Sequence, residues 1–187
     1  AVQVDNGKFG KGFSFDGDGD YVALGGVLSG NVSEFTYSVW VKKVGDSFSY
    51  GGVIGDAMTN ARFAIRDEIT ETRHTLYVRN ASADSFEIVT ANTNYGEWHH
   101  VVATFDNGNT SLYMDGNIVG SSLAFGSTEM DFTGLALNLG TLYNTGTDAF
   151  NGSIDEAMVF NRSLSTEEIS ALYNASANQY YHNFTGL

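Results

Sequence analysis

The chain consists of short apolar runs that alternate with turn-forming residues, and this pattern continues to about residue 161. The runs have the length of strands, and Gly, Asn and Asp separate them. Proline is absent and glycine occurs 22 times in 187 residues, so Gly, Asn and Asp must form the turns. Closely spaced short strands with such turns are typical of a β-sandwich. The expected strands are 35–44, 61–68, 73–80, 86–93, 98–105, 136–143 and 153–160.

Two of these segments carry sharper signals. Segment 35–44, FTYSVWVKKV, has apolar residues on both sets of alternate positions, as expected for a strand that is covered on both faces. Segment 111–122, SLYMDGNIVGSS, is the clearest hairpin, because Asp115 and Gly116 tolerate the positive φ angles of a tight primed turn.

One helix is expected near the C-terminal end. Ser165 stands three residues before Glu168, which is the spacing of a capping box. Leu164 and Ile169 have the spacing of a hydrophobic staple around the same helix start. The sequence therefore predicts an all-β fold, a two-sheet antiparallel sandwich, with one short C-terminal helix.

Charge and hydropathy exclude several partners. The net charge is −13, which argues against nucleic acid and anionic membranes. No apolar run approaches the roughly 18 residues of a membrane helix, so we expect no direct membrane insertion. The composition changes after the helix, so we expect one domain at 1–175 and a linker or the start of a following module at 176–187. The chain is then part of a longer multidomain protein.

The sequence is rich in N-glycosylation triplets, which favours an extracellular or cell-surface location. The alternative is a β surface rich in Ser, Thr and Asn, which produces such triplets without glycosylation. The seven candidate asparagines are Asn31, Asn80, Asn109, Asn151, Asn161, Asn174 and Asn183.

Four segments together resemble a known family. They are GKGFSFDGDGDYVAL, FTYSVWVKK, EWHHVVATFDNGNTSLYMDGNIVGSS and FNGSIDEAMVFNRSLSTEEISALY. In order and spacing they resemble the laminin-G-like jelly-roll domains of the concanavalin A-like lectin/glucanase superfamily, over residues 8–174. The resemblance implies two antiparallel sheets, one of them concave, packed as a jelly roll.

The stretch FDGDGD places Asp16, Asp18 and Asp20 on alternate positions. A phosphate-binding loop is excluded, because it needs helix N-terminal amides and three carboxylates would repel the ligand. An EF-hand is excluded as well, because its sixth and twelfth positions are Tyr21 and Val27. A calcium site and a plain Asx-type turn both remain open.

The resemblance supplies a distant partner for these aspartates. Many related domains carry a structural calcium near their first and last strands, which implies Asp16, Asp20 and Asp155 as metal ligands here. On a regular strand Asp155 shares a face with Ala157 and Val159, so we expect it to be largely buried. Its alternative is satisfaction by backbone amides alone.

The superfamily includes glucanases, which commonly carry Glu-x-Asp-x-x-Glu on one strand. Around Asp155 this chain has Ser153 and Met158 in place of the two glutamates. The adjacent His99 and His100 point to opposite faces of a strand and cannot act together. The sequence therefore predicts a non-catalytic module.

A ligand surface is suggested by arginines in an otherwise acidic chain. Arg62, Arg66, Arg73 and Arg79 fall within 18 residues, and on neighbouring strands they would share a surface with Tyr77. Arginine forks and a tyrosine ring suit an acidic or hydroxyl-rich glycan. Ordinary pairing with interleaved acidic residues is the alternative. The predicted ligand-binding residues are Arg62, Arg66, Tyr77, Arg79, Tyr143 and Asn144, with Tyr50 and Asn60 as further loop candidates.

Three functions fit these observations. The first is an extracellular binding module for carbohydrate or a cell-surface protein ligand, with a structural calcium. The second is a purely structural or protein-interaction module of a surface protein. The third is an accessory module of a secreted glycan-degrading enzyme.

Overall fold

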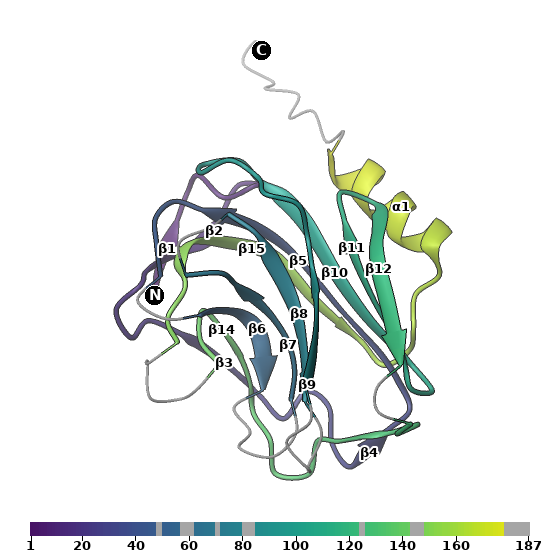
Figure 1. Cartoon of the computed structure of the whole chain (residues 1–187). Coiled ribbons are helices and arrows are strands. Elements are labelled where there is room, and N and C mark those ends of the chain that lie inside the picture. Colours follow the sequence, from purple (N-terminus) through teal and green to yellow (C-terminus); the bar gives the residue numbers. More distant parts are fainter. Residues whose placement is uncertain are drawn as a thin grey trace, which may run out of the picture.

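The computed structural model describes residues 1–47, 50–56, 62–69, 72–79, 85–123, 126–142 and 148–177. Within them two antiparallel sheets face one another, as the sequence predicts (Figure 1). The larger sheet has the strand order β1 (Val2–Val4), β2 (Gly12–Asp16), β15 (Asn151–Phe160), β5 (Glu34–Lys43), β10 (His99–Asp106), β11 (Asn109–Met114) and β12 (Asn117–Leu123). The smaller sheet has the order β3 (Val22–Gly25), β14 (Leu137–Leu139), β6 (Gly51–Asp56), β7 (Arg62–Asp67), β8 (His74–Arg79) and β9 (Ser85–Val89).

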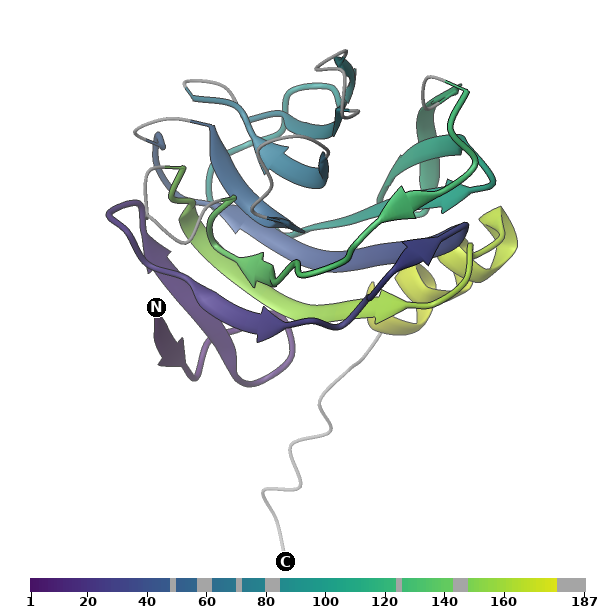
Figure 2. The same ribbon diagram turned by 90° about the horizontal axis from the view of Figure 1, so that it is seen from below.

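We call these the seven-stranded and the six-stranded sheet. A short pair, β4 (Asn31–Val32) and β13 (Met130–Asp131), lies beside them. Viewed from below, both sheets are curved and form the two layers of a sandwich (Figure 2). This arrangement confirms the expected jelly-roll architecture.

Aromatic side chains fill the space between the sheets. Phe35 on β5 stacks on Phe105 of β10, with 5.3 Å between ring centroids. Its other faces meet Phe63 of β7 at 4.7 Å and Phe132 at 5.1 Å. Such edge-to-face and offset contacts add to the free energy gained from burying the rings. Residues of β5, β7 and β10 that alternate with outward-facing ones therefore form one continuous core.

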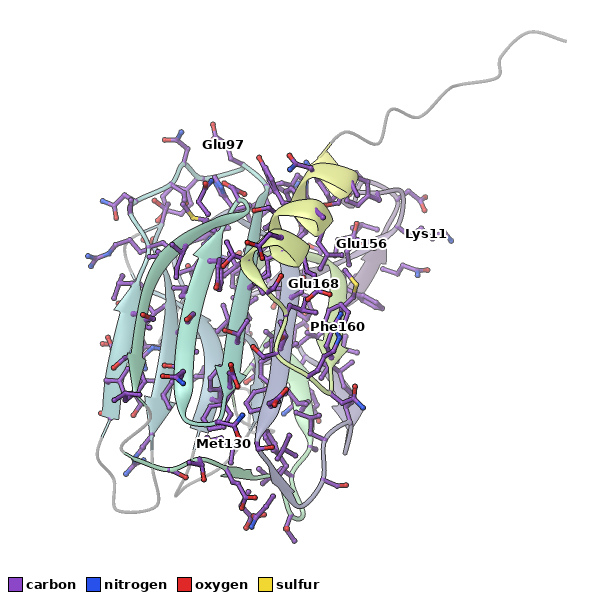
Figure 3. All side chains as sticks on the ribbon, turned by 90° about the vertical axis from the view of Figure 1, so that its right-hand side faces the viewer. Lys11, Glu97, Met130, Glu156, Phe160 and Glu168 are labelled. Atoms are coloured by element: carbon purple, nitrogen blue, oxygen red, sulfur yellow. The ribbon has the colours of Figure 1, made fainter. Side chains whose placement is uncertain are left out.

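The helix α1 (Thr166–Ala177) packs on the outer face of the seven-stranded sheet and lies across the strands in Figure 3. Ile169 is fully buried there and packs with Val102 of β10 and Tyr113 of β11. The indole of Trp40 stacks on Tyr173 of the helix at 5.8 Å, and its Nε1 donates a hydrogen bond to Ser176 at 3.1 Å. Residues 35–41 are thus buried on both faces of the strand, as the composition of this segment indicates.

The expected caps and turns are confirmed. Glu168 N donates to Ser165 Oγ at 3.3 Å, and Ser165 N donates to the Glu168 carboxylate at 2.9 Å, which is a reciprocal capping box. The turn between β11 and β12 has positive φ at Asp115 and Gly116, 51° and 77°. None of the helices in the described ranges is both long and apolar enough to span a membrane.

Gly140, which follows β14, offers a test of core packing. It has φ of 85°, and a Cβ there would overlap the ring of buried Phe15. We expect Gly140→Ala to lower the free energy of unfolding by about 2–4 kcal/mol, from left-handed backbone strain plus overpacking. The measurement is urea unfolding. The control is Gly134→Ala, which has φ of 74° but no atom within 4 Å and should cost only the strain, about 1–2 kcal/mol. Equal losses in the two variants would contradict the packing.

His100 offers a test of the helix-covered face. Its ring lies 5.3 Å from that of Trp40, and its Nε2 is 2.8 Å from Ser38 Oγ. Burial lowers the pKa of His100 to about 4, although Asp115 opposes the shift. The unfolded chain therefore takes up a proton that the folded chain does not, so stability is complete above about pH 6.5 and falls toward pH 4, by up to about 3 kcal/mol.

The free energy of unfolding between pH 4 and 7 measures this effect. His100→Gln keeps a hydrogen-bonding side chain but cannot titrate, so the curve of this variant should be flatter in that window. A slope that is the same in both proteins would contradict the buried neutral imidazole.

Candidate binding site

The outer face of the six-stranded sheet collects the arginines that the sequence singles out. In the register of β7 with β8, Arg66 pairs with Thr75, and Arg62 pairs with Arg79. Tyr77 lies between them, opposite Ala64. The alternating residues of both strands point into the core, so these positions share the outer face. The expectation that the two strands are neighbours is confirmed.

The Arg66 side chain is held between two tyrosine rings. Its guanidinium carbon lies 3.9 Å from the ring centroid of Tyr50 and 4.3 Å from that of Tyr77. One of its terminal nitrogens forms an ion pair with Glu87 of β9. Stacking and a charge-assisted contact together fix the plane of the guanidinium. We call Tyr50, Arg66, Tyr77 and Glu87 the Arg66 cluster.

The Arg66 cluster combines a buried cation with accessible partners. Arg66 is 7% exposed, and its buried Nε has no hydrogen-bond partner among the described residues. Tyr50 is exposed, Tyr77 is half-buried, and the Glu87 side chain is 40% exposed. The accessible part thus offers aromatic edges, phenol hydroxyls and a carboxylate. These groups hydrogen-bond to hydroxyls and stack on apolar ring faces.

A second contact borders the cluster. Thr75 donates a hydrogen bond to the Glu68 carboxylate at 2.8 Å, beside Arg66 in the register of the two strands. Glu68 and Glu87 are therefore each engaged with a residue of β7 or β8. Ordinary surface pairing, the alternative that the sequence leaves open, accounts for the Arg66–Glu87 contact but not for the two stacked rings.

The remaining predicted ligand residues differ in how far the structure describes them. Arg79 is half-buried on β8, two positions from Tyr77. Arg62 is placed by its backbone pairing with Arg79, and its side chain lies outside the described part. Tyr143, Asn144 and Asn60 also lie outside the described residues.

Glu87 is the member that sequence reasoning missed. Its signal was available, because Glu87 alternates with Phe86 and Ile88, which pack against the core. The pairing of β8 with β9 then places it directly opposite Tyr77. The alternation shows that Glu87 faces outward, but only the register of β8 with β9 places it beside Tyr77 and Arg66. A single sequence does not specify that register.

The FDGDGD stretch forms a turn. Asp16 Oδ1 accepts a hydrogen bond from Asp18 N at 2.9 Å, the pattern of an Asx-turn. Gly17 and Gly19 have φ of 84° and 76°, which only glycine adopts readily. Asp20 lies 2.5 Å from the α-amino nitrogen of Ala1.

Asp155 lies elsewhere. Asp16 pairs with Asn151, and Asp155 is four residues further along β15, roughly 13 Å away on a strand. Its carboxylate accepts hydrogen bonds from Phe9 N and Glu156 N, each at 2.8 Å. Among the described residues no three His, Cys, Asp or Glu side chains gather as a metal-binding group. The structure therefore does not bring Asp16, Asp20 and Asp155 together.

A β-bulge corrects the expected facing of β15. Asp155 pairs with Trp40 and Met158 pairs with Ser38, with a break in register between them. Glu156 takes a φ of 48° in this bulge. Asp155 is buried, as predicted, but Val159 turns to the core between the sheets. The prediction that Asp155 and Val159 share a face was wrong because the bulge inserts residues that no regular alternation anticipates.

The paired histidines have structural contacts. His99 Nδ1 lies 2.8 Å from the Asp115 carboxylate, whose other oxygen accepts a hydrogen bond from His100 N. His100 itself is enclosed between the sheet and α1. Their opposite orientation is as expected.

Four of the candidate glycosylation sites are exposed, namely Asn31, Asn109, Asn161 and Asn174. Asn151 is half-buried and donates a hydrogen bond to the Asp46 carbonyl at 3.1 Å. Asn80 and Asn183 lie outside the described residues.

Several solved structures share this architecture. Domain 4 of an extracellular arabinanase from Geobacillus stearothermophilus, solved with arabinotriose, is 22% identical with a TM-score of 0.76, covering 92% of this chain and 80% of that one. A heptameric SAP-like pentraxin from Limulus polyphemus is 15% identical with a TM-score of 0.68, covering 86% and 80%. The botulinum neurotoxin serotype D binding domain is 16% identical with a TM-score of 0.74, covering 95% of this chain but 45% of that one.

No curated protein matches the sequence. A family model described as the concanavalin A-like lectin/glucanases superfamily matches residues 16–170, which is most of the chain. That match agrees with the two facing antiparallel sheets and with the resemblance in the sequence. The chain belongs to the concanavalin A-like lectin/glucanase superfamily.

Proposed function

We propose that this chain is a non-catalytic carbohydrate-binding module that binds its ligand on the outer face of β7, β8 and β9. The observation that carries the proposal is the Arg66 cluster, in which a guanidinium is stacked between Tyr50 and Tyr77 and paired with Glu87. A fixed cation with aromatic neighbours is already ordered before binding, so a ligand meets it at little further entropy cost.

The helix on the outer side of the seven-stranded sheet also favours the six-stranded sheet as the binding face. The outer side of the seven-stranded sheet is covered around Trp40, Val102 and Tyr113 by α1 and by the loop that carries Phe9, whose ring lies 6.0 Å from that of Trp40. The outer face of the six-stranded sheet has instead half-exposed side chains at Tyr77 and Arg79. A ligand can reach polar and aromatic groups there without displacing a helix.

The solved relatives support a binding role. One is an arabinanase domain with bound arabinotriose, and others are toxin binding domains. They share the fold at low identity, so the ligand of this chain is proposed from its own residues. An extracellular setting, glycosylation and a place in a longer multidomain protein belong to the same proposal.

The module is proposed to be non-catalytic because β15 lacks the carboxylates that cleavage needs. Ser153 and Met158 stand where the glucanase pattern has glutamates. Retaining glycosidases need two carboxyl groups about 5–5.5 Å apart. Asp155 uses both carboxylate oxygens on backbone amides.

A glycan array followed by calorimetry with the strongest oligosaccharide tests the binding site. We expect Arg66→Gln and Tyr77→Ala each to weaken binding at least tenfold, about 1.4 kcal/mol, because the first removes the stacked guanidinium and the second removes one of the rings that hold it. The controls are Arg162→Gln and Tyr21→Ala. Arg162 is also paired with a glutamate, Glu168, and Tyr21 is also an exposed tyrosine, but neither belongs to the cluster.

Equal affinity in the cluster variants and the controls would overturn the site. The absence of any glycan ligand on the array would favour the second candidate, a structural or protein-contact module of a surface protein. Binding of a polysaccharide that a neighbouring catalytic domain degrades would identify an accessory module of an enzyme.

Calcium belongs to the proposal at Asp155 rather than at the FDGDGD turn. A cavity of about 230 Å³ adjoins Asp155, and its other polar lining residues are Gln3, Lys11 and Glu156. Calcium accepts such carboxylate and amide oxygens in loose geometry. The proposed ion would draw oxygen ligands from Asp155, Gln3 and Glu156, whereas Asp16 pairs with Asn151, roughly 13 Å along β15 from Asp155.

Thermal melts in chelator and in millimolar calcium test this. An ion that binds only the folded chain adds about 2.7 kcal/mol at 100-fold saturation, which corresponds to several degrees in Tm. Asp155→Asn should remove the response, and Asp16→Asn should keep it. Identical melts in chelator and calcium would contradict a structural calcium, and loss of the response in Asp16→Asn would restore the three-aspartate site.

A further inference from the structure

Three titratable side chains are enclosed at one end of the sandwich, apart from the Arg66 cluster. Lys43 is the last residue of β5, and Asp67 and His74 are register partners on β7 and β8. Their side chains are 1%, 0% and 1% exposed. Lys43 comes from the seven-stranded sheet and the other two from the six-stranded sheet, so the three meet across the core.

The contacts within this group are close. Lys43 Nζ lies 2.8 Å from Asp67 Oδ2, and His74 Nδ1 lies 3.4 Å from Asp67 Oδ1. Lys43 Nζ also donates to the Glu68 carbonyl at 2.5 Å. Neither Asp67 oxygen accepts a well-aligned hydrogen bond from the described residues. Lys43 Nζ therefore lies beside the Asp67 carboxyl group without a well-aligned hydrogen bond to it.

Burial makes the two opposite charges of Lys43 and Asp67 costly to keep. Two charges without water carry a large desolvation cost, which their attraction offsets only when further hydrogen bonds satisfy both groups. Asp67 lacks those hydrogen bonds. Transfer of one proton from the ammonium to the carboxylate produces an amine and a carboxylic acid, and a desolvated lysine amine is a nucleophile.

We propose that Lys43 and Asp67 form an intramolecular isopeptide bond, with His74 as the group that relays the proton. The Nζ lone pair of the neutral amine attacks Cγ of the protonated Asp67 carboxyl group. His74 takes a proton from the nitrogen and returns it to the departing hydroxyl. The C–N bond forms, the C–O bond breaks, and one water molecule leaves, so no oxidant or co-reactant is needed.

The surroundings let the released water reach solvent, and they favour the amide product over the buried charge pair. The ring of Tyr95, which is exposed, lies 5.8 Å from Lys43 Nζ, so the group is one side chain away from solvent. The amide replaces two buried charges by a neutral group. The bond also ties β5 to β7 and thereby links the two sheets covalently, which restricts the unfolded chain as a disulfide does.

The proposal is tested by measuring the intact mass of the wild-type protein. The protein is produced without glycosylation and denatured before the measurement. The mass should be lower than that of the linear sequence by one water molecule. Trypsin should fail to cleave after Lys43, and fragmentation should find a branched peptide that joins residues 43 and 67. A folded protein that keeps its linear mass after prolonged incubation, and that trypsin cleaves after Lys43 once denatured, would overturn the bond.

Variants identify the chemistry. Lys43→Met should have its linear mass. Asp67→Asn can form the same amide by losing ammonia, so its final mass should equal that of the cross-linked wild type. His74→Gln should form the bond more slowly after refolding, whereas formation at the wild-type rate would remove the relay from the proposal.

Discussion

The two-sided burial of β5 is the constraint on which the rest of the structure depends. Residues 35–41 are buried without exception, since one face meets the six-stranded sheet and the other meets α1. Trp40 connects these layers, because its ring contacts His100 of β10 and Tyr173 of the helix. A strand covered in this way cannot present a ligand surface. The proposed binding face is therefore the outer face of the opposite sheet.

On that opposite sheet the strand register brings the arginines together on one face, which composition alone does not show. The chain carries a net charge of −13, yet Arg66 and Arg79 project from one face beside Tyr77. The stacked rings hold the guanidinium in a fixed plane, and Glu87 neutralises part of its charge. The result is a polar and aromatic surface that suits a hydroxylated ligand better than a purely anionic one.

Short-range sequence motifs predicted much of this fold. Features that depend on contacts between distant strands could not be predicted in the same way. The Ser165–Glu168 capping box predicted the start of the helix because both partners are close in sequence. The bulge at Glu156 and the separation of Asp16 from Asp155 depend on pairing between distant strands, which the local sequence does not specify. Lys43 and Asp67 meet across the sandwich, and no alternation within either strand indicates that contact.

Backbone amide shifts during titration with the strongest oligosaccharide test the central claim most directly, because they report on every strand at once. If the ligand binds the outer face of the six-stranded sheet, the largest changes should fall on β7, β8 and β9, around Ala64, Tyr77 and Glu87. Amides of β5, β15 and α1 should change little. Changes confined to the helix-covered face would contradict the account.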